Sequence, residues 1–230
     1  MRPAAKIILA LDVDNFQRAK YLLRRLYPKI KIFKVGIHLF SACGPRIIKA
    51  IREKGGEVFL DLKFFDIPNS VANAVRQAVR LKVRMLTLHI SGGAQMLAAA
   101  VKAAREEAGR LGLKRPLLIG ITVLTSREGK PGDVLMLARA GLKSSLDGMV
   151  CSAREAQVLR KKLKKRFVII TPGIRPGACA DDQRRTATVK EALRAGSDFL
   201  VIGRPILQAK DPLAQAEWIL EEIGTYERRH

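Results

Sequence analysis

Aromatic residues and cysteines are scarce in this sequence. Its 230 residues include eight Phe, three Tyr and one Trp, so few side chains are available to stack on nucleic-acid bases. The three cysteines, Cys43, Cys151 and Cys179, are widely spaced and form no CxxC pair, which argues against a zinc site or a redox disulfide. Cysteines of this kind suit a reducing compartment, and we expect a cytoplasmic protein without a metal site.

Long apolar runs are absent as well. No stretch approaches the roughly 20 apolar residues of a membrane-spanning helix, and no apolar segment near the N-terminus precedes a small-residue cleavage site. The run Ile7 to Leu11 has only the length of a strand. With 48% hydrophobic and 28% charged residues, the composition is typical of a globular chain with a large core. We expect no membrane partner.

Basic residues outnumber acidic residues. The 43 Lys and Arg against 21 Asp and Glu give a net charge of +22, which attracts polyanions. A nucleic-acid-binding protein is therefore one hypothesis, and it predicts tight, strongly salt-dependent binding. The basic residues are spread among apolar positions in segments of helical period, such as Arg18 to Arg25 and Arg160 to Arg166. That distribution favours solvated helix faces, and we expect no specific nucleic-acid partner.

Short apolar runs alternate with segments of helical period, which is the pattern of repeated βα units with a buried parallel sheet. The predicted strands are Lys6 to Asp12, Ile30 to Gly36, Glu57 to Lys63, Met85 to Ile90, Leu117 to Leu124, Gly148 to Ser152, Phe167 to Gly173 and Phe199 to Gly203. The predicted helices include Asn15 to Tyr27, Pro45 to Lys54, Val71 to Leu81, Gln95 to Arg110, Ala153 to Lys164 and Pro212 to Ile223. Eight such units without a linker predict an α/β fold, a single (β/α)8 TIM barrel forming one domain over residues 1–230.

The third unit carries the most informative polar residues, Asp61, Lys63 and Asp66. Strand side chains alternate, so Asp61 and Lys63 share one face, and barrels place their active sites at the C-terminal ends of the strands. Lys34 on the neighbouring strand extends the array to alternating lysines and aspartates. Nearby carboxylates favour the charged form of Lys63, which predicts an acid and not a nucleophile. An ion network that only joins strands is the structural alternative.

The residues after the seventh and eighth strands, Thr171 to Arg175 and Val201 to Pro205, suit a phosphate site. In many barrels these two loops and the start of a short helix bind phosphate. Gly203 permits close backbone approach, Arg204 offers a forked cation, and Pro205 suits the first position of a helix. Turn glycines and a surface arginine are the alternative, which the agreement between two loops disfavours.

Through these motifs the chain resembles the orotidine 5′-phosphate decarboxylases of the bacterial type over nearly its whole length. The matching segments are Ala10-Leu11-Asp12, Phe33-Lys34-Val35-Gly36, Asp61 to Ser70, Leu124-Thr125-Ser126, Thr171 to Arg175, Asp182-Gln183 and Gly203-Arg204. The resemblance implies decarboxylation of orotidine 5′-monophosphate to uridine 5′-monophosphate, the last step of de novo pyrimidine synthesis, without a cofactor or a metal.

The resemblance also implies roles for individual residues. Lys63 is expected to donate a proton, and Lys34, Asp61 and Asp66 to complete a charged tetrad, of which Lys34 and Asp61 also contact the substrate. The expected substrate contacts elsewhere are Asp12 and Thr125 at the nucleoside, and Arg175, Gln183, Gly203 and Arg204 at the phosphate. A homodimer is expected, in which the segment with Asp66, Ile67 and Ser70 reaches the partner's site.

Two positions depart from the family pattern, and one residue separates it from a rival. Phe65 stands where many relatives carry histidine, and Ile90 stands where a small residue is usual. Magnesium-dependent lyases that act on sugar phosphates share the Asp-x-Lys-x-x-Asp array and are the main alternative. Those enzymes resemble this chain but carry an acidic residue where Lys34 stands, and a lysine there repels a metal ion.

Overall fold

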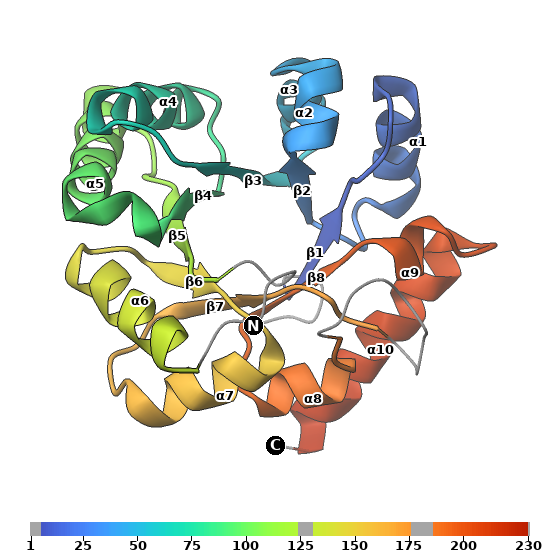
Figure 1. The fold of residues 1–230 in the computed structure, drawn as a ribbon. Coiled ribbons are helices and arrows are strands. Elements are labelled where there is room, and N and C mark those ends of the chain that lie inside the picture. Colours follow the sequence, from blue (N-terminus) through green and yellow to red (C-terminus); the bar gives the residue numbers. More distant parts are fainter. Residues whose placement is uncertain (1–5, 124–130, 176–185, 230) are drawn as a thin grey trace.

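The computed structural model describes residues 6–123, 131–175 and 186–229. Eight parallel strands form a closed barrel in chain order, in which β1 also pairs with β8 (Figure 1). The strands are β1 (Ile7–Ala10), β2 (Ile32–Gly36), β3 (Glu57–Phe64), β4 (Met85–His89), β5 (Leu117–Ile121), β6 (Gly148–Val150), β7 (Val168–Thr171) and β8 (Phe199–Ile202). The predicted (β/α)8 TIM barrel and its eight strands are confirmed, although several strands are shorter than predicted.

Helices surround the barrel on all sides (Figure 1). They are α1 (Phe16–Leu26), α2 (Ile37–Cys43), α3 (Arg46–Glu53), α4 (Pro68–Arg80), η2 (Ile90–Gly92), α5 (Gly93–Arg110), α6 (Pro131–Lys143), α7 (Ala153–Lys162), α8 (Val189–Arg194), α9 (Arg204–Leu207) and α10 (Pro212–Arg229). The six predicted helices are confirmed, whereas α2 was not predicted. Over the residues described, no helix combines the length and the apolar character needed to cross a membrane.

Side chains at the helix starts explain where several helices begin. Asn15 accepts a hydrogen bond from the Arg18 N–H at 2.9 Å and caps α1, because a side-chain oxygen satisfies an amide that has no partner within the helix. Ser152 with Glu155, and Thr188 with Glu191, form reciprocal capping boxes at α7 and α8. Such caps fix the helices at the rim of the barrel, where the strands end.

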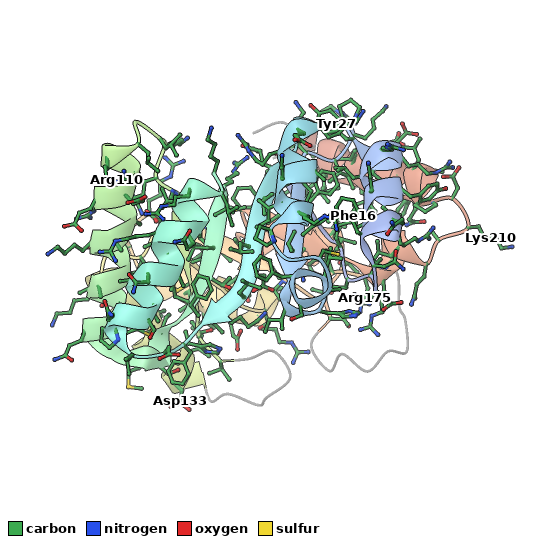
Figure 2. The ribbon with its side chains drawn as sticks, turned by 90° about the horizontal axis from the view of Figure 1, so that it is seen from above. Phe16, Tyr27, Arg110, Asp133, Arg175 and Lys210 are labelled. Carbon is green, nitrogen blue, oxygen red and sulfur yellow. The ribbon has the colours of Figure 1, made fainter. Side chains whose placement is uncertain are left out.

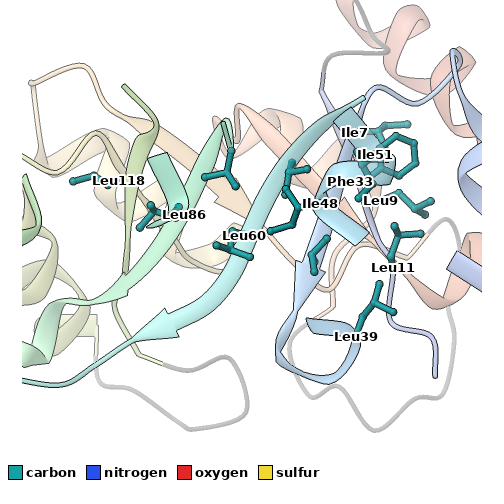
Figure 3. Close-up of a cluster of buried hydrophobic side chains, with 14 of the residues drawn as sticks. Ile7, Leu9, Leu11, Phe33, Leu39, Ile48, Ile51, Leu60, Leu86 and Leu118 are labelled. Atoms are coloured by element: carbon teal, nitrogen blue, oxygen red, sulfur yellow. The ribbon is translucent and has the colours of Figure 1, made fainter. Parts of the chain in front are cut away.

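The alternation of strand side chains divides the core into two parts. Two clusters lie between strands and helices: the larger includes Leu9, Phe33, Leu60 and Leu86 (Figure 3), and the smaller includes Met149 and Leu159. A third cluster fills the inside of the barrel, and its members are Ile8, Ala10, Ile32, Phe59, Met85, Ile119, Ile170, Phe199 and Val201. The barrel is therefore packed and not a pore, and polar residues reach its axis only beyond this apolar layer.

The two ends of the barrel differ in the residues that they present. Tyr27 and Arg110, which follow or end helices, lie at one end, and Asp133 and Arg175 lie at the other (Figure 2). Arg175 follows β7, so its end is the one at which the parallel strands finish. A barrel active site is expected at that end.

Candidate active site

Inside the barrel, a layer of polar side chains lies next to the apolar layer, toward the C-terminal ends of the strands. Strand side chains alternate, so a residue two positions further along points to the same side. Asp12 follows Ala10, Lys34 follows Ile32, and Asp61 follows Phe59 in this way. These three polar residues line a cavity of about 220 Å³, which also contacts Lys63, Gly173, Arg175, Gly203 and Arg204.

Lysine and aspartate side chains alternate across the cavity. The Lys63 Nζ lies 2.8 Å from Asp61 Oδ2, and Lys34 Nζ lies 2.9 Å from Asp12 Oδ1 and 3.8 Å from Asp61 Oδ2. The Lys34 and Asp61 side chains are 12% and 13% exposed, so these charges are held largely out of water, where charge–charge interactions are stronger. An alternating series is therefore present, but it runs Asp12, Lys34, Asp61 and Lys63, whereas the predicted series began at Lys34 and ended with Asp66.

Gly36, at the end of β2, leaves the room that Lys34 occupies. A Cβ atom at position 36 would lie 3.0 Å from Lys34 Nζ and 3.5 Å from Asp12 Oδ1. Its backbone has φ −90°, which any residue adopts, so space and not conformation requires glycine here. The motif Lys34-Val35-Gly36 thus places a cation and the space for it on one strand.

Lys63 has an unusual backbone. Its φ is 52°, and the pairing of β3 with β4 shifts register between Leu60 and Phe64. The Lys63 N–H donates to the Thr87 hydroxyl at 2.8 Å. Asp61 and Lys63 lie together as predicted, but they do so in an irregular strand, and simple alternation predicted neither the bulge nor the contact with Thr87.

The connection from β3 to α4 is exposed to solvent. Asp66 Oδ1 accepts from the Ile67 N–H at 2.6 Å, and no ion pair of Asp66 with another described residue is present. Asp66 and Ser70 are exposed, and so are the apolar side chains of Phe65 at 62% and Ile67 at 65%. Within one chain the structure thus brings Lys34, Asp61 and Lys63 together but not Asp66.

His89, at the end of β4, contacts the same loop. Its ring meets that of Phe65 edge to face, with centroids 5.6 Å apart. Burial lowers the pKa of His89 and the charge of Lys63 lowers it further, against the opposing effect of Asp61. A neutral imidazole beside an aromatic ring suits packing of the loop better than proton transfer.

The residues after β7 and β8 also line the cavity. Gly173 has φ 75°, and the chain returns beside it through hydrogen bonds between Arg175 N–H and Ala187 O at 2.9 Å and between Ala187 N–H and Gly173 O at 3.2 Å. Arg175 is only 7% exposed. A Cβ atom on Gly203 would lie 3.3 Å from Ala10 Cβ, so glycine lets β8 close tightly on β1.

The cavity therefore combines two chemically different ends. Arg175 and Arg204 provide forked donors that suit a phosphate group, while Lys34, Asp61 and Lys63 provide fixed charges at the axis. A ligand with a phosphate at one end and a reacting acidic group at the other fits this distribution of charge.

Comparison with known proteins identifies the family. A family model described as "Orotidine 5′-phosphate decarboxylase / HUMPS family" matches residues 5–219. The chain belongs to this family. A protein of Moorella thermoacetica named orotidine 5′-phosphate decarboxylase is 46% identical over 97% of this chain and 94% of its own length, and one of Pseudomonas paraeruginosa with the same name is 47% identical over 95% and 97%.

A solved structure supports the same membership in the orotidine 5′-phosphate decarboxylase / HUMPS family. The crystal structure of orotidine 5′-phosphate decarboxylase from Lactobacillus acidophilus superimposes with a TM-score of 0.83 at 35% identity, and the match covers 94% of this chain and 97% of that one. Fold and sequence therefore agree over almost the whole barrel.

The family's expected site residues are only partly visible in the structure. Thr125 and Gln183 lie outside the described residues. The other predicted residues at the cavity are Asp12, Lys34, Asp61, Lys63, Arg175, Gly203 and Arg204. Asp66 and Ile67 lie on the exposed connection from β3 to α4, and Ser70 is exposed in the first turn of α4. Thr87 was missed because it stands within an apolar strand run and belongs to no motif.

Proposed function

We propose that Lys63 donates the proton in the decarboxylation of orotidine 5′-monophosphate to uridine 5′-monophosphate, the last step of de novo pyrimidine synthesis. The chain is a carboxy-lyase, the class of enzyme to which the names of its relatives refer. The observation that carries the proposed role is the position of the Lys63 ammonium, 2.8 Å from Asp61 in a cavity that two arginines also line.

The proposed reaction needs a cation at the carbon that loses CO₂. The bond between C6 of the pyrimidine and its carboxylate breaks, CO₂ leaves, and the electron pair stays on C6. The Lys63 ammonium stabilises that developing charge and transfers a proton from Nζ to C6. Lys63 is left as a neutral amine, which regains a proton from water after product release.

Lys34 and Asp61 keep the proton donor in place. Asp61 Oδ2 faces both ammonium groups, at 2.8 Å from Lys63 and 3.8 Å from Lys34. A donor fixed in this way needs little reorganisation during the reaction. Asp61 also lies where it repels the substrate carboxylate, which favours loss of CO₂ over the bound ground state.

The rest of the nucleotide is assigned to other residues of the predicted site. We assign the phosphate to Arg175, Gln183, Gly203 and Arg204, and the nucleoside to Asp12 and Thr125. The tight closure of Gly203 on β1 and the burial of Arg175 support this assignment. Phosphate binding far from C6 supplies binding energy for orientation at the reacting carbon.

We also propose that the chain acts as one catalytic domain in a homodimer. The exposed apolar side chains of Phe65 and Ile67 support this, because exposed apolar patches beside a site mark interaction surfaces. Asp66, Ile67 and Ser70 would then contribute to the partner's cavity, and Asp66 would complete the tetrad there.

A cytoplasmic location and a reaction without a metal or a redox cofactor complete the proposal. The free thiols of Cys43 and Cys151 support a reducing compartment. The magnesium-dependent lyase is disfavoured because Lys34 Nζ stands between Asp12 and Asp61, where an ammonium opposes a divalent cation. No group of three or more potential metal ligands occurs within the described residues.

The test is the loss of orotidine 5′-monophosphate absorbance with purified protein in EDTA. Lys63→Ala is expected to lower kcat by about 10²- to 10⁴-fold, the usual contribution of a positioned acid. Lys82→Ala is a matched control, because Lys82 is an exposed lysine with a similar φ of 54° on the loop before β4. Equal activity of Lys63→Ala and Lys82→Ala would refute the role of Lys63, and turnover only of a sugar phosphate with magnesium would refute the reaction.

A further inference from the structure

The backbone of β3 is irregular at the residue that carries the proposed proton donor. From Leu60 to Phe64, β3 advances four residues while β4 advances two, from Leu86 to Leu88. Within this bulge Lys63 has φ 52°, a left-handed conformation that a lysine seldom adopts. Such a conformation persists only where surrounding contacts hold it.

Thr87 supplies such a contact. It lies on β4 between the two residues that pair with either end of the bulge, and it is completely buried. Its hydroxyl oxygen is 2.8 Å from the backbone nitrogen of Lys63 and 3.0 Å from Asp61 Oδ1. Because an N–H only donates, the hydroxyl accepts from Lys63 and has its own proton free to donate to the carboxylate.

The hydrogen bonds close into a ring. The Lys63 N–H donates to the Thr87 hydroxyl, the hydroxyl donates to Asp61 Oδ1, and Asp61 Oδ2 accepts from Lys63 Nζ at 2.8 Å. Thr87 thus replaces a partner that the register shift removes from the backbone of Lys63, and it fixes the carboxylate that holds the ammonium. Hydrogen bonds linked in this way inside a protein strengthen one another.

We propose that Thr87 is a positioning residue of this site, whose hydroxyl sets the place of the Lys63 ammonium. Thr87 does not reach the reacting carbon but acts through Lys63 and Asp61. This inference rests on the proposed function, since it assigns Thr87 to a reaction in which Lys63 delivers a proton. Without the hydroxyl, the Lys63 N–H and Asp61 Oδ1 each lose a buried partner, and the ammonium is no longer confined to one position.

Two pairs of variants isolate the hydroxyl. Wild type and Thr87→Val have side chains of similar shape, and Thr87→Ser and Thr87→Ala differ by one oxygen atom. The second pair keeps the test decisive if valine at position 87 prevents folding. Ser197→Ala is the matched control, because the Ser197 hydroxyl is buried and hydrogen-bonded to Thr171 at 2.6 Å, remote in sequence from the β3 bulge.

The measurements are kcat and KM for orotidine 5′-monophosphate and the Kd of uridine 5′-monophosphate. A fourth measurement is the exchange of the C6 proton of uridine 5′-monophosphate in D₂O, which reports proton transfer to and from Lys63 without the loss of CO₂. Loss of the hydroxyl in either pair is expected to lower kcat and the exchange rate by about 10- to 100-fold, the effect of a misplaced catalytic group. KM and the product Kd are expected to stay near wild type, since the phosphate contacts are intact. Ser197→Ala is expected to lose stability but not kcat.

Two results overturn the proposal. One is equal kcat within both pairs, and the other is a parallel loss of kcat and product binding, which indicates general disruption of the site. Failure of the proposed function is separate, because it appears as a wild-type protein that does not decarboxylate the substrate. In that case, a crystal structure of Thr87→Ala still tests the positioning, and unchanged Lys63 φ and Nζ position would refute it.

Discussion

The side chain of Ile90 fills the space that Gly120 leaves on the neighbouring strand. A Cβ atom at position 120 would lie 2.7 Å from Cδ1 and from Cγ1 of Ile90, and one on Gly141 would lie 3.0 Å from the same Cδ1. Ile90 is one of the two positions at which the resemblance to the family implies a different residue, here a small one. Two glycines on β5 and α6 therefore accommodate the larger side chain.

Gly120→Ala is expected to destabilise the protein by about 1–3 kcal/mol, because an added methyl group overpacks this part of the core. The cost should shrink or reverse in an Ile90→Ala background, which by itself loses about 2–5 kcal/mol through the cavity that it creates. Urea denaturation of the four proteins measures the coupling. Additive effects of the two substitutions would contradict this account.

Gly36→Ala is expected to lower kcat while leaving the fold intact. The new methyl group would lie 3.0 Å from Lys34 Nζ, and the flexible end of the lysine can move away from it. The ammonium is then displaced from its position in the cavity, and kcat is expected to fall by about tenfold or more. Gly109→Ala, on α5 with open space around it, is the control and should keep full activity. Activity assays with thermal melts distinguish the two effects, and full activity of Gly36→Ala would argue against the importance of the Lys34 position.

Glu107 is expected to make stability depend on acid pH. It is buried on α5 and accepts from Arg80 at 2.7 Å and from Arg110 at 2.7 Å, and hydrogen bonds from Arg110 and Arg80 lower its pKa to about 2. A carboxyl whose pKa is lower in the folded state stabilises the fold fully above its unfolded pKa of about 4.3. That contribution is lost as the pH falls from there towards 2.

The measurement compares unfolding free energies of wild type and Glu107→Gln between pH 6 and pH 2. The advantage of wild type should be constant above about pH 5 and decline below it. Glu106→Gln is a matched control, because Glu106 is an exposed neighbour with ion pairs of 3.7 and 3.8 Å only. A difference that does not change with pH would contradict the assignment.

Cys151 is expected to resist alkylation in the native protein. It is completely inaccessible, and burial raises the pKa of its thiol, so neither contact with a reagent nor formation of thiolate is favoured. Cys43 is partly exposed and should react first with iodoacetamide. Peptide mass spectrometry before and after unfolding in urea separates the two thiols, and native labelling of Cys151 at the rate of Cys43 would count against the packing around β6.

The sequence predicted the barrel well because buried parallel strands are apolar on both faces. Runs such as Ile7–Ala10 and Val168–Thr171 are apolar or β-branched throughout, so each stood out against the helices on either side. The ends of the strands were predicted less accurately, because residues such as Asp12 continue the line of a strand after its pairing with the neighbouring strand has stopped. Helix α2 follows β2 directly after Gly36, and no polar segment between the two indicates where the helix begins.

Within the site, the sequence predicted that Lys34, Asp61 and Lys63 lie together but not how the chain holds them. Asp61-Leu62-Lys63 reads as a regular strand, and a register shift leaves no mark in a pattern of period two. Thr87 in turn reads as one more β-branched strand residue. Asp66 belongs to the same motif, and the pattern did not show that it lies on an exposed connection without an ion pair to another described residue.

The pairing of β1 with β8 makes the first and last strands of the barrel direct neighbours. Asp12 follows one of them, and Gly203 and Arg204 follow the other. During synthesis, which presents the N-terminal part first, the residues to which we assign the nucleoside and the phosphate stay apart until nearly the whole barrel has been made. The cavity is therefore completed only when the last strand pairs with the first, and cleavage before β8 would both open the barrel and remove Gly203 and Arg204 from the cavity.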